Sequence, residues 1–155
     1  MMIEGAHTFT APREAVWKLL LDPEVIGKTM PGATEMRLTG DGTYQGKVKV
    51  GIGAITAAEF DLHITLVDMF TPERYTMQID GRGTLGFTRG TALVELLPAT
   101  PGPGTILHYK AEMQVGGKVA AVGQRLLDSV SKMMARQGLE ALSAELERRL
   151  DGGGG

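Results

Sequence analysis

Hydrophobic and polar residues alternate with a period of two through residues 33–115, and turn residues interrupt the alternation at intervals. The clearest case is residues 58–66, where apolar side chains at even positions alternate with polar side chains at odd positions. This period is typical of strands with one buried and one solvated face. Together with a further strand at residues 2–10, the pattern predicts an antiparallel sheet of about seven strands.

The apolar spacing changes to three and four residues after the last predicted strand. This spacing predicts a long amphipathic helix over residues 118–150. At a length of roughly 45 Å the helix would outspan a sheet of ordinary strands, so it should bend, break at Gly138 or project. The stripe consists of Val119, Val122, Leu126, Val130 and Met133.

Two proline residues mark the starts of two short helices between the first strand and the rest of the sheet. Pro12 and Pro23 each precede a short run of helix-compatible residues, and proline is well tolerated in the first turn of a helix. The loop around the second helix, residues 22–32, ends in Pro31 and Gly32. A stiff residue beside a permissive one makes this segment the best candidate for a lid.

These elements predict an α+β fold of the helix-grip type. A sheet with one apolar face needs a cover, and the C-terminal helix is the only long one predicted. We therefore expect a curved antiparallel sheet of about seven strands wrapped around that helix, with two short helices after the first strand. A single domain should span residues 1–150, followed by a disordered glycine tail at 151–155.

The composition excludes several classes of function. The chain has 155 residues and no cysteine, which removes thiol nucleophiles, disulfides and thiolate metal sites. Its net charge of −2 argues against an electrostatic nucleic-acid binder. Because no signal peptide or long apolar run is visible, we interpret the protein as cytoplasmic. The 22 glycines are best explained by turns, by sheet curvature and by room for a ligand.

The three histidines divide by strand parity. His63 and His108 fall on the polar face of the sheet, whereas His7 shares its parity with Ile3 and Phe9 and should point inward. An inward histidine is usually a hydrogen-bonded core residue, and as neutral imidazole it can also donate to a ligand carbonyl. No pair of histidines has metal-ligand spacing, and we find no inward pair of carboxylates. No catalytic residue, metal site or covalently bound cofactor is therefore predicted.

Small residues on the strand at residues 84–97 suggest an internal cavity. Gly86, Thr88, Gly90, Ala92 and Val94 share one face, and small side chains opposite a helix leave space that a ligand can fill. Replacing Gly90 or Ala92 with Phe or Leu should then block uptake without unfolding the chain. The predicted cavity residues are His7, Phe9, Met30, Val48, Phe60, Leu62, Met77, Gly90, Ala92, Tyr109, Met113, Val119, Val122, Gly123 and Leu126.

Four segments together resemble the CoxG family of carbon monoxide dehydrogenase subunits, which belongs to the START-like (SRPBCC) superfamily. They are residues 3–17 (IEGAHTFTAPREAVW), 21–25 (LDPEV), 30–32 (MPG) and 115–126 (VGGKVAAVGQRL). The resemblance implies a non-catalytic accessory protein of a carbon monoxide dehydrogenase-type molybdenum hydroxylase. It also implies binding of an apolar molecule such as a quinone or lipid, and a role in membrane recruitment or in delivery of an electron acceptor. Longer relatives carry an apolar C-terminal anchor where this sequence has Asp151 and glycines.

Two other functions remain open on the sequence. A cyclase- or dehydratase-like enzyme of the same superfamily would need an inward pair such as His7 with Tyr109. A protein-interaction module would use the polar sheet face or the distal helix, residues 139–150, where a leucine stripe would be more exposed than a monomer tolerates. The partners expected are therefore an apolar small molecule, molybdenum hydroxylase subunits and peripheral contact with the inner face of the membrane, in a monomer or homodimer.

Overall fold

The computed structural model describes residues 1–99 and 102–152, which form one seven-stranded sheet, three α-helices and a short 3-10 helix. The sheet contains β1 (Met2–Phe9), β2 (Ala33–Gly40), β3 (Thr43–Ile52), β4 (Ile55–Phe70), β5 (Arg74–Gly83), β6 (Gly86–Pro98) and β7 (Thr105–Gly116). The helices are α1 (Arg13–Leu21), α2 (Pro23–Thr29), η1 (Lys118–Val122) and α3 (Gln124–Gly152).

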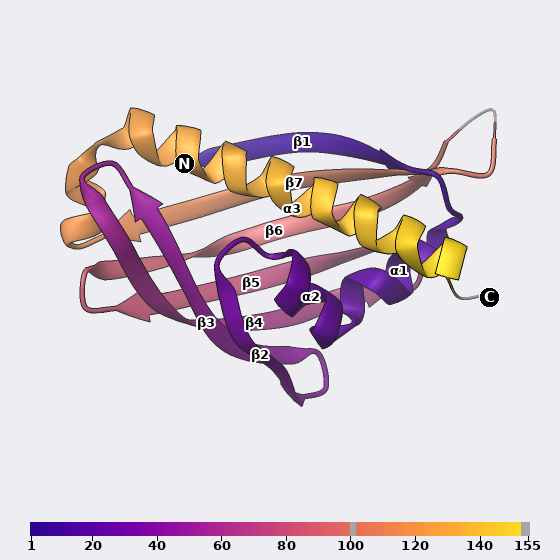
Figure 1. Ribbon diagram of the computed structural model, residues 1–155, viewed down its shortest axis with the longest axis horizontal. Coiled ribbons are helices and arrows are strands. Elements are labelled where there is room, and N and C mark those ends of the chain that lie inside the picture. The colour runs from indigo at the N-terminus through magenta and orange to yellow at the C-terminus, as the bar shows by residue number, and fades with distance from the viewer. Residues whose placement is uncertain (100–101, 153–155) are drawn as a thin grey trace.

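The sheet is a continuous meander from β2 to β7, and β1 adds to β7 at the far edge. The strand order is β1-β7-β6-β5-β4-β3-β2, and each neighbouring pair is antiparallel. The long helix α3 crosses one face of the curved sheet, while α1 and α2 lie together beside its C-terminal half (Figure 1). This arrangement confirms the predicted α+β helix-grip fold.

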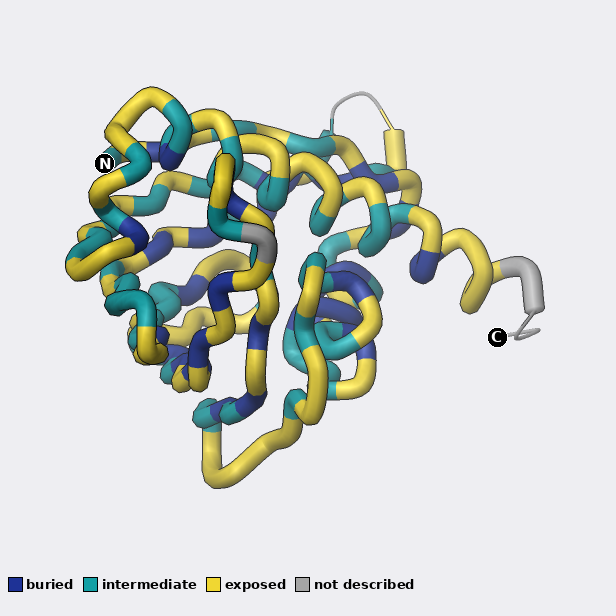
Figure 2. Tube along the Cα trace, turned by 60° about the vertical axis from the view of Figure 1, so that its left-hand side comes forward, coloured by how far each residue is buried: buried dark blue, intermediate teal, exposed yellow. Residues whose placement is uncertain are grey.

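Alternation along the strands sets which side chains face α3. On β4 the residues Ala58, Phe60, Leu62, Ile64 and Leu66 are all buried, and the residues between them face outward. The register carries this division across the sheet, because residues directly opposite each other share a face. Buried and exposed residues alternate along the trace in the same way (Figure 2).

The two short helices begin as the prolines predict. Pro12 precedes α1, and Pro23 is the first residue of α2. The Asp22 carboxylate caps α2 by accepting a hydrogen bond of 2.9 Å from the Glu24 backbone N–H. The Tyr44 hydroxyl donates to the Leu21 carbonyl at 2.6 Å and so attaches the end of α1 to β3.

The predicted long helix is wrong at its start and in its expected break. Residues 118–122 form the 3-10 helix η1, and α3 begins only after Gly123, whose φ of +101° is a conformation that favours glycine. Gly138 does not interrupt α3. The helix also continues through Asp151 and Gly152, which were expected in a disordered tail; residues 153–155 of that tail lie outside the described residues.

The distal leucine stripe of α3 does not form the exposed surface that the sequence suggested. Leu139 and Leu142 pack against the core, and Leu146 is only 4% exposed. Leu150, at 49% exposed, is the one member left on the surface. Cover by the sheet alone would leave this stripe exposed, whereas α1 and α2 supply the additional cover.

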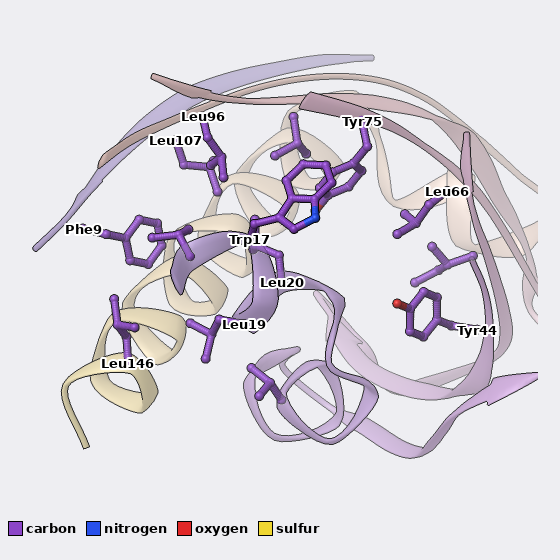
Figure 3. Packing of buried hydrophobic residues seen from close by; sticks show 14 of the residues in the cluster. Phe9, Trp17, Leu19, Leu20, Tyr44, Leu66, Tyr75, Leu96, Leu107 and Leu146 are labelled. Carbon is purple, nitrogen blue, oxygen red and sulfur yellow. The ribbon is translucent and has the colours of Figure 1, made fainter. Parts of the chain in front are cut away.

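The apolar core falls into two clusters of buried residues. The first lies around α1 and the distal half of α3, where Trp17 contacts Tyr75 with ring centroids 5.4 Å apart (Figure 3). The second lies at the opposite end of the sheet, under η1 and the first turns of α3. It consists of Val48, Ile52, Ala58, Phe60, Val119 and Leu127. A domain of this size usually has one contiguous core, so the division is informative.

Candidate ligand-binding site

Small side chains occupy the inner face of the sheet between the two clusters. Ala92 on β6 is opposite Met77 of β5 and Ala111 of β7, and it belongs to neither cluster. Gly90, two residues earlier, is opposite Ile79 and Met113. These rows place little side-chain volume beneath α3 at mid-sheet.

Several inward residues around these rows keep partial solvent exposure although α3 covers this face. They are Met77, Ile79, Tyr109, Ala111 and Met113. The neighbouring inward positions Val94, Leu96 and Leu107 are buried. Side chains under a covering helix that still contact solvent indicate accessible space between the sheet and the helix.

The helical wall of this space comes from the stripe of α3 that faces the sheet. Leu126, Val130 and Met134 pack towards the second cluster, and Leu139 and Leu142 towards the first. Methionine also occurs on the sheet side, at Met77 and Met113. Unbranched thioether side chains adjust readily to irregular shapes, so this wall can reshape around an apolar guest.

One polar pair bridges the sheet and α3 inside the space. The His7 Nε2 atom lies 2.5 Å from the Ser143 hydroxyl, which joins β1 to α3. The His7 ring also packs edge-on against Phe9, with centroids 4.9 Å apart. His7 therefore points inward, as its parity predicts, and its partner is a helix residue that the sequence pattern did not single out.

Ser143 could have been found from the same apolar spacing that located the helix. It lies four residues after Leu139 and three before Leu146, so it falls on the apolar stripe. A serine within such a stripe is placed opposite the sheet, where a polar partner is required. Ala111 and Met134 also belong to the walls and were likewise not among the predicted residues.

Two tyrosines near the α1 end remain neutral. Burial raises the pKa of the Tyr44 phenol, and the nearby Asp22 carboxylate raises it further. Burial also raises the pKa of Tyr75, with a smaller contribution from Tyr44. Neither phenol therefore adds a charge to the interior at neutral pH.

The α2 segment closes one end of the space. Met30 follows α2 and packs on the first cluster, while the Lys49 N–H donates to the Gly32 carbonyl at 3.0 Å. A Cβ atom placed on Gly138 of α3 would lie 3.8 Å from both Pro31 Cδ and the Thr29 carbonyl oxygen. The helix thus passes close over the predicted lid segment because position 138 has no side chain.

The structure brings most of the predicted cavity residues to the inner face. Phe9 and Leu62 are buried in the first cluster, against which Met30, Met77 and Tyr109 pack. Val48, Phe60 and Val119 are buried in the second, against which Val122 and Leu126 pack. His7, Gly90, Ala92 and Met113 lie on the strands between. Gly123 is different, because it is an exposed link between η1 and α3 with no atom within 4 Å of its Cβ position.

Gly90 has a steric role that its position in the alternation did not reveal. A Cβ atom there would collide with the carbonyl oxygen of Glu112 and with Met113. A bulky side chain at Gly90 would therefore disturb the pairing of β6 with β7 instead of only filling the cavity. The expectation that Gly90→Phe leaves the fold intact is wrong, and Ala92 is the suitable position for that experiment.

Two hollows on the molecular surface lie outside the inner space. One, of about 1130 Å³, lies mostly over outward residues of β4–β7, including His63, Asp80 and Arg89. The other, of about 530 Å³, lies at the β5–β6 turn beside Lys118. His63 thus occupies the polar outer face that its parity predicts, and His108, also outward, lies 3.1 Å from the Glu4 carboxylate.

Comparisons with known proteins identify relatives over nearly the whole chain. The family model for carbon monoxide dehydrogenase subunits of the CoxG type matches residues 5–147. A conserved protein from Geobacillus kaustophilus superposes with a TM-score of 0.89 at 29% identity, with 96% of this chain and 97% of that chain covered. A START superfamily protein from Mycobacterium smegmatis gives 0.72 at 12% identity, with 95% and 97% covered. No curated protein matches the sequence.

One further property bears on membrane association. No helix in the part of the chain that the structure describes is both long and apolar enough to cross a bilayer.

Proposed function

Since the chain belongs to the CoxG family of carbon monoxide dehydrogenase subunits, we propose that it binds an apolar small molecule, a quinone or lipid, between the sheet and α3 without catalysing a reaction on it. The bound molecule would lie between the two apolar clusters, beneath Met134 and against Ala92 and Ala111. Burial of its hydrocarbon part contributes about 25 cal/mol per Å² of apolar area. Binding proteins commonly combine such a surface with a few polar groups that orient the ligand.

The divided core is the observation that carries this proposal. Two well-buried clusters lie at opposite ends of the sheet, and the residues between them are small or flexible and partly exposed. Empty apolar space loses dispersion contacts, so a fold that keeps such a region gains stability when an apolar guest fills it. Flexible methionines on both walls favour a guest of variable shape.

The family description supports the biological setting of the proposal. We propose that the chain serves a carbon monoxide dehydrogenase-type molybdenum hydroxylase, either by bringing it to the membrane or by supplying its electron acceptor. Contact with the inner face of the membrane would be peripheral. Delivery of an acceptor is the more economical role, because it uses the same apolar space that the ligand proposal requires.

Extraction of the protein purified from its native host tests the ligand proposal. Organic extraction followed by mass spectrometry should recover an apolar molecule in an amount comparable to the protein. The same extraction from a version purified in the presence of a competing detergent should recover less. Recovery of no apolar molecule, together with no uptake of added quinone or lipid, would refute the proposal.

An enzymatic function is the second candidate, because His7 and Tyr109 both lie on the inner face. Gly5 is opposite Tyr109, and His7 is two residues further along β1, so the pair is adjacent. Acid–base chemistry would have to rest on these groups alone, since the described inward positions of β1 and β3–β7 include no carboxylate. Conversion of a bound substrate that stops in His7→Ala, with binding retained, would favour the enzyme.

A protein-interaction role is the third candidate, and the hollow over β4–β7 is the observation that favours it. Its lining mixes acidic, basic and amide side chains on the solvated face of the sheet. Charge reversal at Arg89 would weaken association with a partner through this face and leave uptake of an apolar ligand unchanged.

A further inference from the structure

The inner face of the sheet is uncharged. On the described residues of β1 and β3–β7, the positions that face α3 include no Asp, Glu, Lys or Arg. An ionised group taken from water into such a surface meets no counter-charge, and its desolvation is then costly. A neutral polar group loses far less, provided that it makes hydrogen bonds.

Most inward hydroxyl groups near the clusters are already used by the fold. The Tyr44 hydroxyl donates to the Leu21 carbonyl at 2.6 Å, and the Thr105 hydroxyl donates to the Ala11 carbonyl at 2.7 Å. These bonds join strands to the α1 region. They leave little polar capacity at that end of the interior.

The Tyr109 hydroxyl is different. It lies over Gly5 of β1, 2.6 Å from the position that a Cβ atom would take there. It makes no hydrogen bond to any residue that the structure describes, and its oxygen is not fully enclosed, so it is open to solvent within the space. His7 follows two residues after Gly5 on the same face and holds Ser143 from α3.

These three side chains converge at the edge of the gap between the two clusters. Tyr109 packs against the first cluster, and Met113 and Ala111 continue along the same face of β7 towards the second. A ligand lying in the gap would therefore meet polar atoms at one end and only apolar side chains along the rest of its length. This is the arrangement expected for a molecule with one polar end and a hydrocarbon body.

We infer that His7, Ser143 and Tyr109 bind the polar end of the ligand and that the site selects an end that is uncharged. The inference rests on the proposed function and narrows its ligand class to molecules with a carbonyl or hydroxyl end, to the exclusion of carboxylates and phosphates. The Tyr109 hydroxyl donates to the ligand oxygen, and the His7–Ser143 pair supplies the second hydrogen-bonding partner.

A matched pair of ligands tests the selection. Oleyl alcohol and oleate share one hydrocarbon chain and differ only in the polar end, and at about pH 8 oleate is fully ionised. Each competes with the neutral fluorophore N-phenylnaphthylamine for the full-length protein. The alcohol should displace the fluorophore at concentrations at least about tenfold lower than oleate, below the concentration at which either ligand forms micelles.

Two variants locate the effect. Tyr109→Phe removes one oxygen without changing the shape of the ring, and Ser143→Ala removes the hydroxyl that binds His7. Each should weaken displacement by the alcohol by about threefold to tenfold, the size of one net hydrogen bond, with fluorophore affinity unchanged. Ser129→Ala, at an exposed position of α3, is the control and should behave as wild type.

The outcomes separate this inference from the proposed function. If the fluorophore and both ligands fail to bind, the proposed function fails and this inference with it. If the fluorophore binds but oleate competes as well as the alcohol, the selection for an uncharged end is overturned while the binding function stands. Unchanged alcohol affinity in both Tyr109→Phe and Ser143→Ala overturns the assignment of these residues.

Discussion

Glu145 and Arg149, one turn apart on α3, are joined by a hydrogen bond of 3.1 Å from the guanidinium Nε to the carboxylate. Arg148 donates to the same carboxylate, and Arg149 also reaches the Asp22 carboxylate at 3.4 Å. Since Asp22 caps α2, this network fastens the end of α3 to the segment that closes the ligand space. The hydrogen bonds from Arg148 and then Arg149 lower the pKa of Glu145 to about 2.

The first prediction concerns acid stability. Because the folded pKa of Glu145 lies below its ordinary value of 4.5, the unfolded chain binds more protons between those values. The stabilisation from Glu145 is therefore complete above about pH 4.5 and is lost as the pH falls towards 2. Glu145→Gln should be less stable than wild type at neutral pH and should lose less stability on acidification.

Urea unfolding across this pH range measures the effect. Glu147→Gln, at an exposed position two residues away, is the matched control and should reproduce the wild-type pH dependence. An identical acid-induced loss of stability in wild type and Glu145→Gln would contradict the role assigned to the network.

The second prediction concerns the passage of α3 over the lid segment. An alanine at Gly138 would meet Pro31 and the Thr29 carbonyl only at ordinary contact distance. Gly138→Ala should therefore stabilise the protein by about 0.5–1 kcal/mol, because alanine is a better helix former than glycine. Gly138→Phe has no such room and should cost about 1–3 kcal/mol by forcing the helix and lid apart.

Denaturant unfolding of both variants gives the free energies, and the exchange rate of a bound fluorophore reports on the lid. Faster exchange in Gly138→Phe and unchanged exchange in Gly138→Ala are expected. If the two substitutions have the same sign on stability, the close approach at Gly138 is not a constraint.

The third prediction compares a cluster residue with a gap residue on neighbouring strands. Leu96 on β6 is buried in the first cluster, whereas Met113 on β7 is partly exposed in the gap. Leu96→Ala should cost about 2–5 kcal/mol, and Met113→Ala less than about 1.5 kcal/mol, because no comparable cavity is created. Equal costs, measured by denaturant unfolding of the ligand-free protein, would mean that the core is continuous through this region.

Much of the fold could be predicted because strand alternation and the two prolines are local signals. Ala58–Leu66 face inward as their period requires, and Pro23 begins a helix. The start of α3 could not be placed in this way, since the apolar spacing continues from Val119 through Leu126 while the backbone turns at Gly123. That turn depends on backbone geometry that side-chain periodicity does not contain.

The site was predictable where a single strand determined it and not where two elements meet. The inward direction of His7 follows from parity, but its bond to Ser143 depends on how α3 is rotated against β1. The contact of Gly90 with Glu112 likewise depends on the pairing of β6 with β7. Burial of Leu146 depends on α1 and α2, whose prolines predict where they begin and not what they cover.

The most direct test of the binding space is to fill it from the sheet side. Ala92 faces inward at 5% exposed, and Thr91 beside it faces outward, so Ala92→Phe and Thr91→Phe place the same ring on opposite faces of β6. Native mass spectrometry should detect quinone or lipid on wild type and Thr91→Phe but not on Ala92→Phe, which should stay folded because its ring occupies the ligand space. Retention of the ligand by Ala92→Phe, or its unfolding for want of room, would contradict the account.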